Sequence, residues 1–240
     1  MSSNKDGPKV AVITGGGSGI GLAMARTFAG SGYSVVITGR DAKRLQRAAA
    51  DISADKKGVT SVACDVRDPA SVKNLFREIG KQHSTVDVLI NNAGVAHSLA
   101  PVDQLPIETW KEVIETNLTG TFLVTRAALP LMRTGGTIVN NLSVAALQPF
   151  AGMSAYNASK FGALGFTHAL REDLRKRGIR VVALLPGATS TDIWGQFWAD
   201  APKEKMISAE TVAQAVLHAV SAPANTAIEE IRIGPAAGVL

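Results

Sequence analysis

The chain has 240 residues and a formal net charge of +5, and 46% of its residues are hydrophobic and 19% charged. This composition excludes a disordered chain, and the longest aliphatic run, Val181 to Leu185, is far shorter than the roughly 18 residues of a membrane span. With one cysteine and four scattered histidines that form no paired motif, neither an internal disulfide nor a metal site is expected.

Short β-branched runs alternate with longer helical patterns, and no break rich in Pro, Gly or Ser divides the chain. Strands are predicted at 9–14, 34–38, 59–64, 86–91, 136–142, 179–185 and 228–233. Helices are predicted at 19–31, 41–54, 69–82, 107–133, 152–177 and 208–221. Several helices begin with good N-caps, namely Asp41, Asp68 followed by Pro69, and Ser208 followed by Glu210.

The strands are nearly continuous apolar runs, which is typical of strands covered on both faces. Their alternation with helices implies right-handed crossovers. The pattern therefore predicts an α/β fold in which a Rossmann-like doubly wound parallel sheet of seven strands carries helices on both faces. Residues 1–240 are expected to form a single domain, with its ligand site beyond the carboxyl ends of the strands.

The segment TGGGSGIG, residues 14–21, follows the first predicted strand and opens the first predicted helix. Glycines there permit a sharp turn, close approach of a pyrophosphate to main-chain N–H groups, and tight packing of the helix on the sheet. No Lys followed by Ser or Thr ends the loop, so P-loop chemistry is not expected. The candidate dinucleotide-binding residues of this loop are Gly15, Gly17, Ser18, Gly19, Ile20 and Gly21.

The glycine spacing GxxxGxG resembles that of the short-chain dehydrogenase/reductase family, and the resemblance extends over essentially the whole chain. The other matching elements stand in family order: CDV at 64–66, NNAG at 91–94, Asn117, Ser143, YNASK at 156–160 and PGATST at 186–191. The resemblance implies an NAD(P)-dependent oxidoreductase that acts on CH–OH groups, with residues 1–240 as its Rossmann-type cofactor domain.

Tyr156 and Lys160 are four residues apart in a predicted helix, so their side chains share one face. An ammonium near a phenol, together with an oxidised nicotinamide, favours the phenolate and would lower the pKa of the tyrosine from about 10. Taken alone, the pair could also be a packing tyrosine and a solvated lysine. The resemblance implies catalysis, in which Ser143 orients the substrate oxygen and Asn117 holds a water that links Lys160 to solvent.

The resemblance also assigns cofactor contacts at the ends of later strands. Asp65 would accept from the adenine amino group, Lys160 would bind the nicotinamide ribose, and Thr191 would bind the carboxamide or the pyrophosphate. The remaining candidates for cofactor contact are Val66, Asn91, Ala93, Gly94, Tyr156, Pro186 and Gly187. Several of them, such as the Pro-Gly pair, could equally be plain turn residues.

The end of the second predicted strand, VVITGRD, bears on cofactor choice. In NAD-preferring members of the family an acidic residue ends this strand, and the matching position here is Gly39. Arg40 follows it and Arg44 lies one turn into the next helix, where a guanidinium suits a 2′-phosphate. Asp41 is interpreted as the N-cap of that helix. The sequence therefore predicts NADP(H) as the preferred cofactor, with NAD(H) as a second one.

The segment near 188–207 holds Trp194 and Trp198 and is predicted to form a short lid over the substrate. The alternative is that these tryptophans anchor a small helix to the core. Residues flanking the motifs are candidates to complete the pocket: Val95, His97, Leu147, Gln148, Phe150 and Met153.

The predicted reaction is hydride transfer between nicotinamide and a carbonyl or secondary alcohol, with Tyr156 as general acid or base and no metal. Two alternatives stay open, a 3-oxoacyl-(acyl-carrier) reductase of fatty-acid synthesis and a non-catalytic NADP(H)-binding sensor. The family usually assembles through its two long helices. Helices 107–133 and 152–177 would then form a homodimer or homotetramer.

The partner is expected to be a small molecule. The basic residues form two weak clusters, at 40–47 and 171–180, on predicted amphipathic helices, and aromatic residues make up only 5% of the chain, so no nucleic-acid partner is expected. The first residues, MSSNKDGPK, lack the apolar core of a secretory signal. A cytoplasmic location without a membrane partner is therefore expected.

Overall fold

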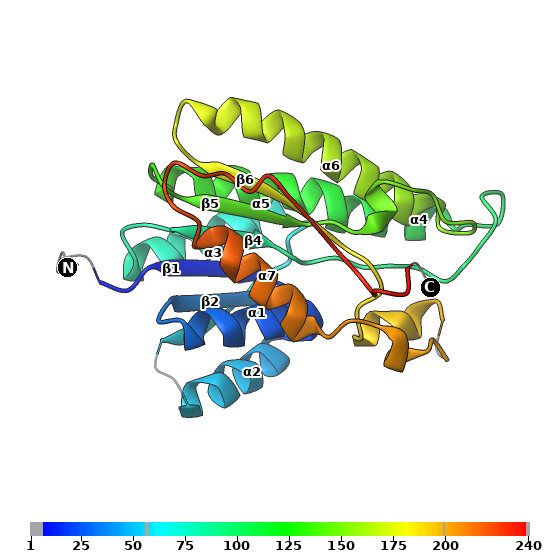
Figure 1. Ribbon diagram of the computed structural model, residues 1–240, viewed down its shortest axis with the longest axis horizontal. Coiled ribbons are helices and arrows are strands. Elements are labelled where there is room, and N and C mark those ends of the chain that lie inside the picture. The colour runs from blue at the N-terminus through cyan, green and yellow to red at the C-terminus, as the bar shows by residue number, and fades with distance from the viewer. Residues whose placement is uncertain (1–6, 56–57, 199, 239–240) are drawn as a thin grey trace.

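The computed structural model describes residues 7–55, 58–198 and 200–238. Within these residues the strands form one parallel sheet in the order β3-β2-β1-β4-β5-β6-β7 (Figure 1). The strands are β1 (Val10–Thr14), β2 (Ser34–Gly39), β3 (Val59–Ala63), β4 (Val88–Asn91), β5 (Thr137–Asn141), β6 (Arg180–Pro186) and β7 (Glu230–Ile233). The predicted sheet of seven strands is confirmed, and each strand begins and ends within two residues of its predicted bounds.

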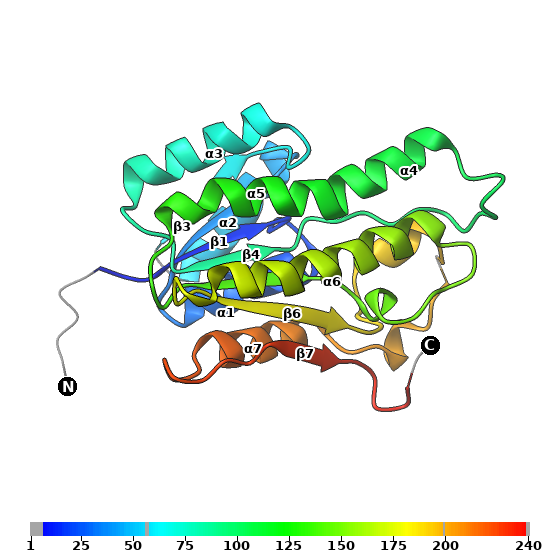
Figure 2. The same cartoon turned by 90° about the horizontal axis from the view of Figure 1, so that it is seen from above.

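Helices cover the sheet on both faces, as Figures 1 and 2 show. The helices are α1 (Gly19–Gly30), α2 (Ala42–Asp55), α3 (Pro69–Gln82), α4 (Ile107–Ile114), α5 (Gly120–Ala128), α6 (Ser154–Arg175) and α7 (Ala209–Val220). One hydrophobic core joins the sheet to α1, α2 and α7, and a second joins its other face to α3, α5 and α6. Among the described residues, no helix combines the length and the apolar character needed to cross a membrane.

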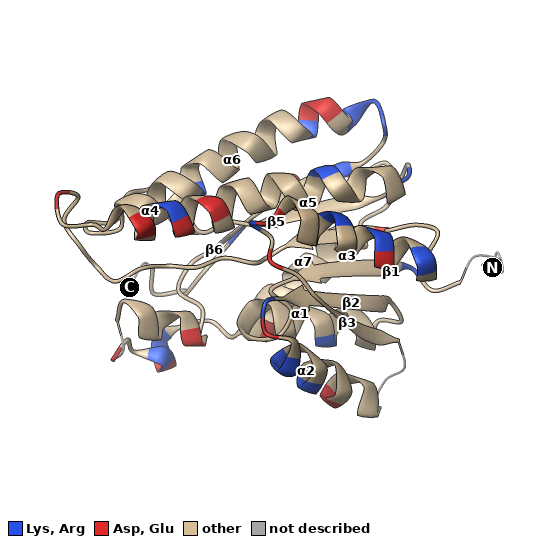
Figure 3. Cartoon of the chain, turned by 180° about the vertical axis from the view of Figure 1, so that it is seen from behind, with Lys and Arg blue, Asp and Glu red and all other residues tan. Residues whose placement is uncertain are grey.

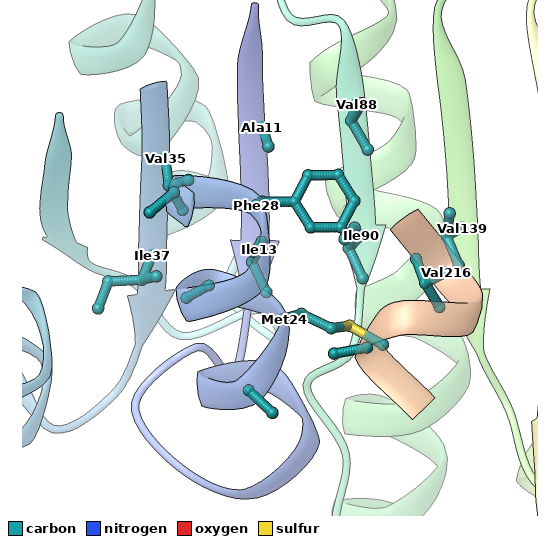
Figure 4. Close-up of a cluster of buried hydrophobic side chains, with 14 of the residues drawn as sticks. Ala11, Ile13, Met24, Phe28, Val35, Ile37, Val88, Ile90, Val139 and Val216 are labelled. Atoms are coloured by element: carbon teal, nitrogen blue, oxygen red, sulfur yellow. The ribbon is translucent and has the colours of Figure 1, made fainter. Parts of the chain in front are cut away.

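Successive residues of β1 enter opposite cores. Ala11 and Ile13 pack with Phe28 of α1 (Figure 4), whereas Val12, between them, belongs to the core on the α3 and α5 side. Both faces therefore need apolar residues, which explains the continuous apolar run in the sequence. Removing the fully buried Phe28 side chain would cost about 3–5 kcal/mol.

The edge strands differ from this pattern. Residues of β7 are alternately exposed and half-buried, and β3 buries only Val59 fully. The expectation that every strand is covered on both faces is therefore wrong for these two. Each has a neighbouring strand on one side only, so the helices that cover the central strands leave its outer side chains open to solvent.

The predicted N-caps are confirmed. Asp41 Oδ1 accepts from the Arg44 N–H at 3.0 Å, and this hydrogen bond is the main cause of a lowered Asp41 pKa. Asp68 accepts from the main-chain N–H groups at the start of α3, and Ser208 does so at the start of α7. The interpretation of Asp41 as the N-cap of α2 therefore holds.

The predicted single helix over 107–133 is wrong in its continuity. A π-helical turn, Glu115–Thr119, separates α4 from α5, and a 3-10 turn, Leu129–Leu131, follows α5. Asn117 lies in the π-helical turn, and its side chain bonds to the main chain of Val95, outside the helix. The hydrogen bonds of Asn117 to a segment outside the helix thus occur where the helix changes from α to π. The hydrophobic periodicity of the sequence does not reveal this change.

Candidate active site

A cavity of about 740 Å³ lies at the carboxyl ends of the central strands. The strand order reverses between β1 and β4, and residues that follow both strands line the cavity. The rest of its wall comes from the ends of β5 and β6, the start of α6 and the segment after β6. This is the position at which doubly wound folds bind ligands.

The glycine loop forms one side of the cavity, which we call the loop wall (Gly15, Ser18, Gly19 and Ile20). Gly15 and Gly19 have φ angles of 63° and 51°, in the left-handed region that favours glycine. A side chain at Gly19 would meet Thr191, since a Cβ there would lie 3.3 Å from Thr191 Cγ2. Gly19 and Thr191, two predicted cofactor contacts, are thus neighbours in the wall of the cavity.

Gly21 has a different role from the predicted one. The sequence suggested that its lack of a side chain lets the helix pack on the sheet. A Cβ at Gly21 would instead lie 2.3 Å from the carbonyl oxygen of Gly15 and 2.4 Å from Asn92 Nδ2. Gly21 therefore keeps the first helical turn close to the start of its own loop.

Ser143, Tyr156 and Lys160 converge on the cavity from η3 (Val144–Ala146) and α6. The Lys160 ammonium lies 5.5 Å from the centre of the Tyr156 ring, so the four-residue spacing does place both on one helix face. Lys160 Nζ donates to the Asn141 carbonyl oxygen at 3.2 Å. Ser143 Oγ accepts from the Ala145 N–H at 3.1 Å, which holds the hydroxyl at the end of β5.

Burial is the main cause of the pKa shifts of Tyr156 and Lys160. It raises the pKa of Tyr156 above its ordinary value, although a hydrogen bond with Ser143 acts in the opposite direction. It lowers the pKa of Lys160 to about 8. In the chain without its cofactor, desolvation dominates, and the lowering of the Tyr156 pKa by Lys160 together with an oxidised nicotinamide stays a prediction. In this state Tyr156 holds its proton at neutral pH.

Asn117 clamps the loop that follows β4. Its Oδ1 accepts from the Val95 N–H, and its Nδ2 donates to the Val95 carbonyl and, at 3.0 Å, to Ser159 Oγ. A Cβ at Gly94 would lie 3.3 Å from Asn117 Oδ1 and 3.7 Å from Lys160 Nζ. Both hydrogens of the Asn117 side-chain amide are thus engaged in hydrogen bonds. Asn117 Oδ1 and Lys160 Nζ both lie close to Gly94.

Several predicted cofactor residues line the cavity, and one points elsewhere. The lining includes Ala93, Gly94, Tyr156, Lys160, Pro186, Gly187 and Thr191. The buried Asn91 side chain instead donates to Thr125 Oγ1 at 2.9 Å and to Asn140 Oδ1 at 2.8 Å. Its side chain is therefore part of the contact between the sheet and α5, and the cofactor contact predicted for Asn91 at the end of this strand stays a prediction.

Asn92, which the sequence did not single out, lines the cavity. Its Nδ2 donates to the carbonyls of Thr14 at 2.9 Å and Gly15 at 3.2 Å, and its Oδ1 accepts from Asn141 Nδ2 at 2.8 Å. Asn92 thus links the glycine loop to the strand whose carbonyl holds Lys160. Its place in NNAG was visible, but which of the two asparagines faces the cavity depends on the alternation of β4.

Asp65, Arg40 and Val66 are also not among the residues that line the cavity. Asp65 is paired with Arg67, whose Nη2 lies 2.6 Å from Asp65 Oδ2, and this pairing lowers the Asp65 pKa. Arg40 Nη1 lies 3.5 Å from Glu112 Oε1, so these two side chains form an ion pair. Val66 is buried, against Gly120 of α5. The pairings of Asp65 and Arg40 are contacts that the sequence did not predict, and either charge would have to exchange its partner to bind a cofactor.

A second hollow, of about 320 Å³, lies beside the glycine loop. Gly17 lines it, together with Lys43, Arg44 and Arg47 of α2, and Asp41 and Asp51 contribute opposite charge. Arg44 also lines the main cavity. Figure 3 shows the basic residues of α2 near this end of the sheet. The predicted Gly17 contact therefore falls in a basic hollow next to the loop. Across the described part of the chain, no three His, Cys, Asp or Glu residues gather as metal ligands would.

The segment after β6 forms the opposite side of the cavity, which we call the lid wall (Asp192, Ile193, Trp194, Gln196, Phe197 and Trp198). It begins with the 3-10 turn η4 (Asp192–Gln196), and a shorter one, η5 (Lys203–Lys205), follows it. Gln196 Oε1 accepts from the Ala96 N–H at 3.1 Å, and Ser98 Oγ donates to the Gln196 carbonyl at 3.2 Å. The tryptophans thus line the cavity instead of anchoring a separate helix.

The predicted flanking residues divide into two groups. Phe150 and Met153 line the cavity, whereas Val95, Leu147 and Gln148 do not. His97 is buried behind it. Its Nε2 accepts from the Tyr156 main-chain N–H at 3.4 Å, so it supports the first turn of α6 instead of facing a ligand.

The family model of the short-chain dehydrogenases matches residues 9–202, and the chain belongs to this family. It is 35% identical over 237 residues to sulfoacetaldehyde reductase 2 of Chromohalobacter salexigens, with 94% of each chain covered. A short chain dehydrogenase from Burkholderia cenocepacia, solved in complex with NADP, is 32% identical with a TM-score of 0.86, covering 96% of this chain and 98% of that one.

A 3-ketoacyl-(acyl-carrier-protein) reductase from Brucella melitensis, solved in complex with NADH, is 29% identical with a TM-score of 0.86, covering 95% of this chain and 97% of that one. These similarities confirm the predicted family and fold. They also confirm the prediction of an oxidoreductase of the short-chain dehydrogenase class.

Proposed function

We propose that this protein is an NADP(H)-dependent reductase of carbonyl compounds, working reversibly on the corresponding secondary alcohols. The observation that carries the proposal is the convergence of Ser143, Tyr156 and Lys160 on one cavity that the glycine loop also borders. When bound, the dinucleotide supplies the hydride, which goes to the carbonyl carbon. The chain's own residues then have to orient the carbonyl oxygen and give it a proton.

Tyr156 is suited to give that proton, since its raised pKa keeps the phenol protonated in the free enzyme. The Ser143 hydroxyl donates to the substrate oxygen and polarises it. Lys160, whose ammonium lies 5.5 Å from the centre of the Tyr156 ring, would return a proton to Tyr156, and the Asn141 carbonyl accepts a hydrogen bond from this ammonium. The oxygen of Asn117 lies near Lys160, which fits the proposed water link to solvent.

The main cavity and the basic hollow support a preference for NADP(H). Gly39 leaves no carboxylate at the end of β2, and Arg44 lies where the hollow and the cavity meet. A guanidinium at this place suits a 2′-phosphate. The NADP complex of the Burkholderia protein agrees with this choice, and the NADH complex of the Brucella protein keeps NAD(H) as a second cofactor.

The other proposed contacts follow the cavity wall. Gly15, Ser18, Gly19 and Ile20 would hold the pyrophosphate, and Ala93, Gly94, Pro186, Gly187 and Thr191 the ribose and nicotinamide parts. Asp65 and Val66 border the adenine side. Residues 1–240 would act as one domain with the segment 188–207 as its lid, in the cytoplasm.

The subunit is proposed to assemble as a homodimer or homotetramer. Phe122 of α5 and Phe161 of α6 are each more than two-fifths exposed. Large apolar side chains at the surface of neighbouring helices are typical of an interface. Light scattering of the purified protein, compared with Phe122→Lys, tests this assembly.

The experiment for the main proposal follows NADPH oxidation with a panel of aldehydes and ketones, for the parent and for Tyr156→Phe. We expect the parent to reduce carbonyls and the variant to be slower by at least about 10²-fold, the usual contribution of positioned acid-base catalysis. NADPH affinity should stay nearly unchanged, because the phenol oxygen serves the substrate. Equal rates in both proteins, or no turnover of any carbonyl, would contradict the proposal.

The 3-oxoacyl reductase alternative is favoured by the similarity to the Brucella enzyme. It predicts high activity on acyl thioesters attached to a carrier protein. Adding a 3-oxoacyl carrier protein to the same panel separates the two: a carbonyl reductase turns over simple ketones at least as well as the thioester.

A further inference from the structure

The substrate part of the cavity is lined by large apolar side chains. They come from the loop after β4, the start of α6, and the lid wall, and they are Leu99, Phe150, Met153, Trp194, Phe197 and Trp198. Ser143 and Tyr156 line the same cavity, so a carbonyl group held by them has its substituents among these side chains. The chemistry of this lining therefore bears directly on which carbonyl compounds fit.

The aromatic residues of the lid wall present carbon surface to the cavity. The Trp194 ring contacts Phe197 and Trp198, with ring centres 5.0 and 6.0 Å apart. Its indole N–H is already used, because it donates to the Thr189 carbonyl at 2.8 Å. A ligand beside Trp194 therefore meets an apolar face without a free hydrogen-bond donor.

Two of these side chains are strongly exposed around the cavity. Leu99 is 58% exposed and Trp198 is 42% exposed, although each is large and apolar. Exposed apolar surface in a concave site gains free energy when an apolar ligand covers it. A small polar substrate would leave this surface in contact with water.

The charged and polar groups of this part do not form an anion site. Among the described residues, Asp192 and Arg232 are the charged side chains that line the cavity outside the loop wall and the catalytic group, apart from Arg44 of the basic hollow. Both are exposed, and they carry opposite charges. The Gln196 side-chain oxygen is engaged by the Ala96 N–H. A carboxylate or sulfonate would thus find one solvent-exposed guanidinium, that of Arg232, in a lining that also includes the Asp192 carboxylate.

We propose that the substrate is an aldehyde or ketone with a bulky uncharged apolar substituent, an aryl or long alkyl group, and not a small anionic or polyhydroxylated carbonyl. The inference rests on the proposed function, because it names the substrate class of the same cavity. The aromatic lid wall covers the apolar substituent while Ser143 and Tyr156 hold the carbonyl oxygen.

The test measures kcat/KM at saturating NADPH for 2-butanone, 2-hexanone, 2-octanone, acetophenone, pyruvate and glyceraldehyde. We expect kcat/KM to rise by up to about fourfold for each added methylene, so that 2-octanone, with four more methylenes than 2-butanone, exceeds it by up to about 250-fold. Acetophenone should exceed pyruvate and glyceraldehyde by a similar factor. If pyruvate or glyceraldehyde is the better substrate, the substrate class is overturned while the proposed reductase function stands.

Variants locate the effect in the lining. Leu99→Ala and Trp198→Ala should each reduce kcat/KM for 2-octanone by about tenfold and leave 2-butanone nearly unchanged. Val102→Ala is the matched control, since Val102 is 76% exposed in the same loop and does not line the cavity. Equal loss for both ketones in the cavity variants, or the same loss in the control, overturns the inference. Absence of turnover with every carbonyl contradicts the proposed function itself.

Discussion

The loop wall and the lid wall enclose the same cavity but are held in different ways. The loop wall depends on main-chain geometry: Gly15 and Gly19 adopt positive φ, and the Asn92 amide bonds to carbonyl oxygens of the loop. The lid wall depends on side chains, with Trp194 packed on its aromatic neighbours and Gln196 bonded to Ala96.

The difference has consequences for recognition and for tolerance. A wall made of main chain suits the dinucleotide, which is the same for every carbonyl substrate. Such a wall leaves no room for an added side chain. In a wall made of side chains, a substitution changes the side chain that faces the cavity without changing the course of the main chain. The loop wall should therefore fail abruptly on substitution, whereas the lid wall should respond gradually and in a substrate-dependent way.

The largest expected effect comes from adding one methyl group behind the loop wall. Gly21→Ala places a Cβ 2.3 Å from the Gly15 carbonyl oxygen, so the loop must move. We expect NADPH to bind about 5- to 150-fold more weakly, since overpacking of this kind typically costs about 1–3 kcal/mol. Calorimetric titration measures the affinity, and circular dichroism checks that the variant is folded.

Gly195→Ala in the lid segment is the counterpart. A Cβ there has nothing within 4 Å, and Gly195 does not have a positive φ. NADPH affinity should change by less than about twofold, because no contact is disturbed. If the two glycines respond alike, the contrast between the walls is wrong.

The proposed catalytic residues Ser143, Tyr156 and Lys160 line the same cavity, and the pH dependence of the reaction is the next effect in size. Because burial lowers the pKa of Lys160 to about 8, the lysine of the free enzyme loses its proton as the pH rises through this value. The kcat/KM for NADPH in the reduction direction should therefore fall above pH 8, by up to tenfold per pH unit. Below that value the charged lysine is retained and the profile should be flat.

Lys160→Arg distinguishes this group from others. A guanidinium keeps its charge throughout the accessible range, so the fall near pH 8 should disappear even if the overall rate is lower. A variant that retains the same limb would show that another group titrates there. The measurement is a pH series of initial rates at limiting NADPH.

The loop wall was largely predictable from the sequence. Glycines at 15 and 19 after a strand indicate one kind of turn, because few other residues adopt positive φ without strain. The spacing of Tyr156 and Lys160 likewise follows from helical periodicity. Both signals are local, so a short motif contains the information.

Other parts of the site depend on contacts distant in sequence and could not be read from it. The ion pair of Arg40 with Glu112 and the π-helical turn around Asn117 arise from packing. The raised pKa of Tyr156 reflects burial by several segments. The hydrogen bond from Ala96 to Gln196 joins residues one hundred positions apart, and no periodicity indicates it.

Arg44 tests the outer edge of the loop wall. It lines both the main cavity and the basic hollow, and its side chain is 63% exposed. Arg44→Ala should lower the ratio of kcat/KM for NADPH over NADH by about tenfold, or 1.4 kcal/mol, if it contacts the 2′-phosphate. Arg26→Ala, an exposed arginine of α1, should leave the ratio unchanged. An unchanged ratio in Arg44→Ala would remove this residue from cofactor choice.

The smallest expected effect lies in the lid wall. Gln196→Ala removes the acceptor of the 3.1 Å hydrogen bond from Ala96 but keeps the main-chain carbonyl that accepts from Ser98. A single hydrogen bond contributes about 0.5–1.5 kcal/mol, so KM for the carbonyl substrate should rise by about two- to tenfold. NADPH affinity should not change, because the loop wall is intact. Gln196→Glu keeps an acceptor oxygen and should restore most of the loss, whereas Gln148→Ala, outside the cavity, should behave like the parent. If NADPH affinity falls together with the substrate, the two walls are coupled and the lid is not an independent, side-chain-held element.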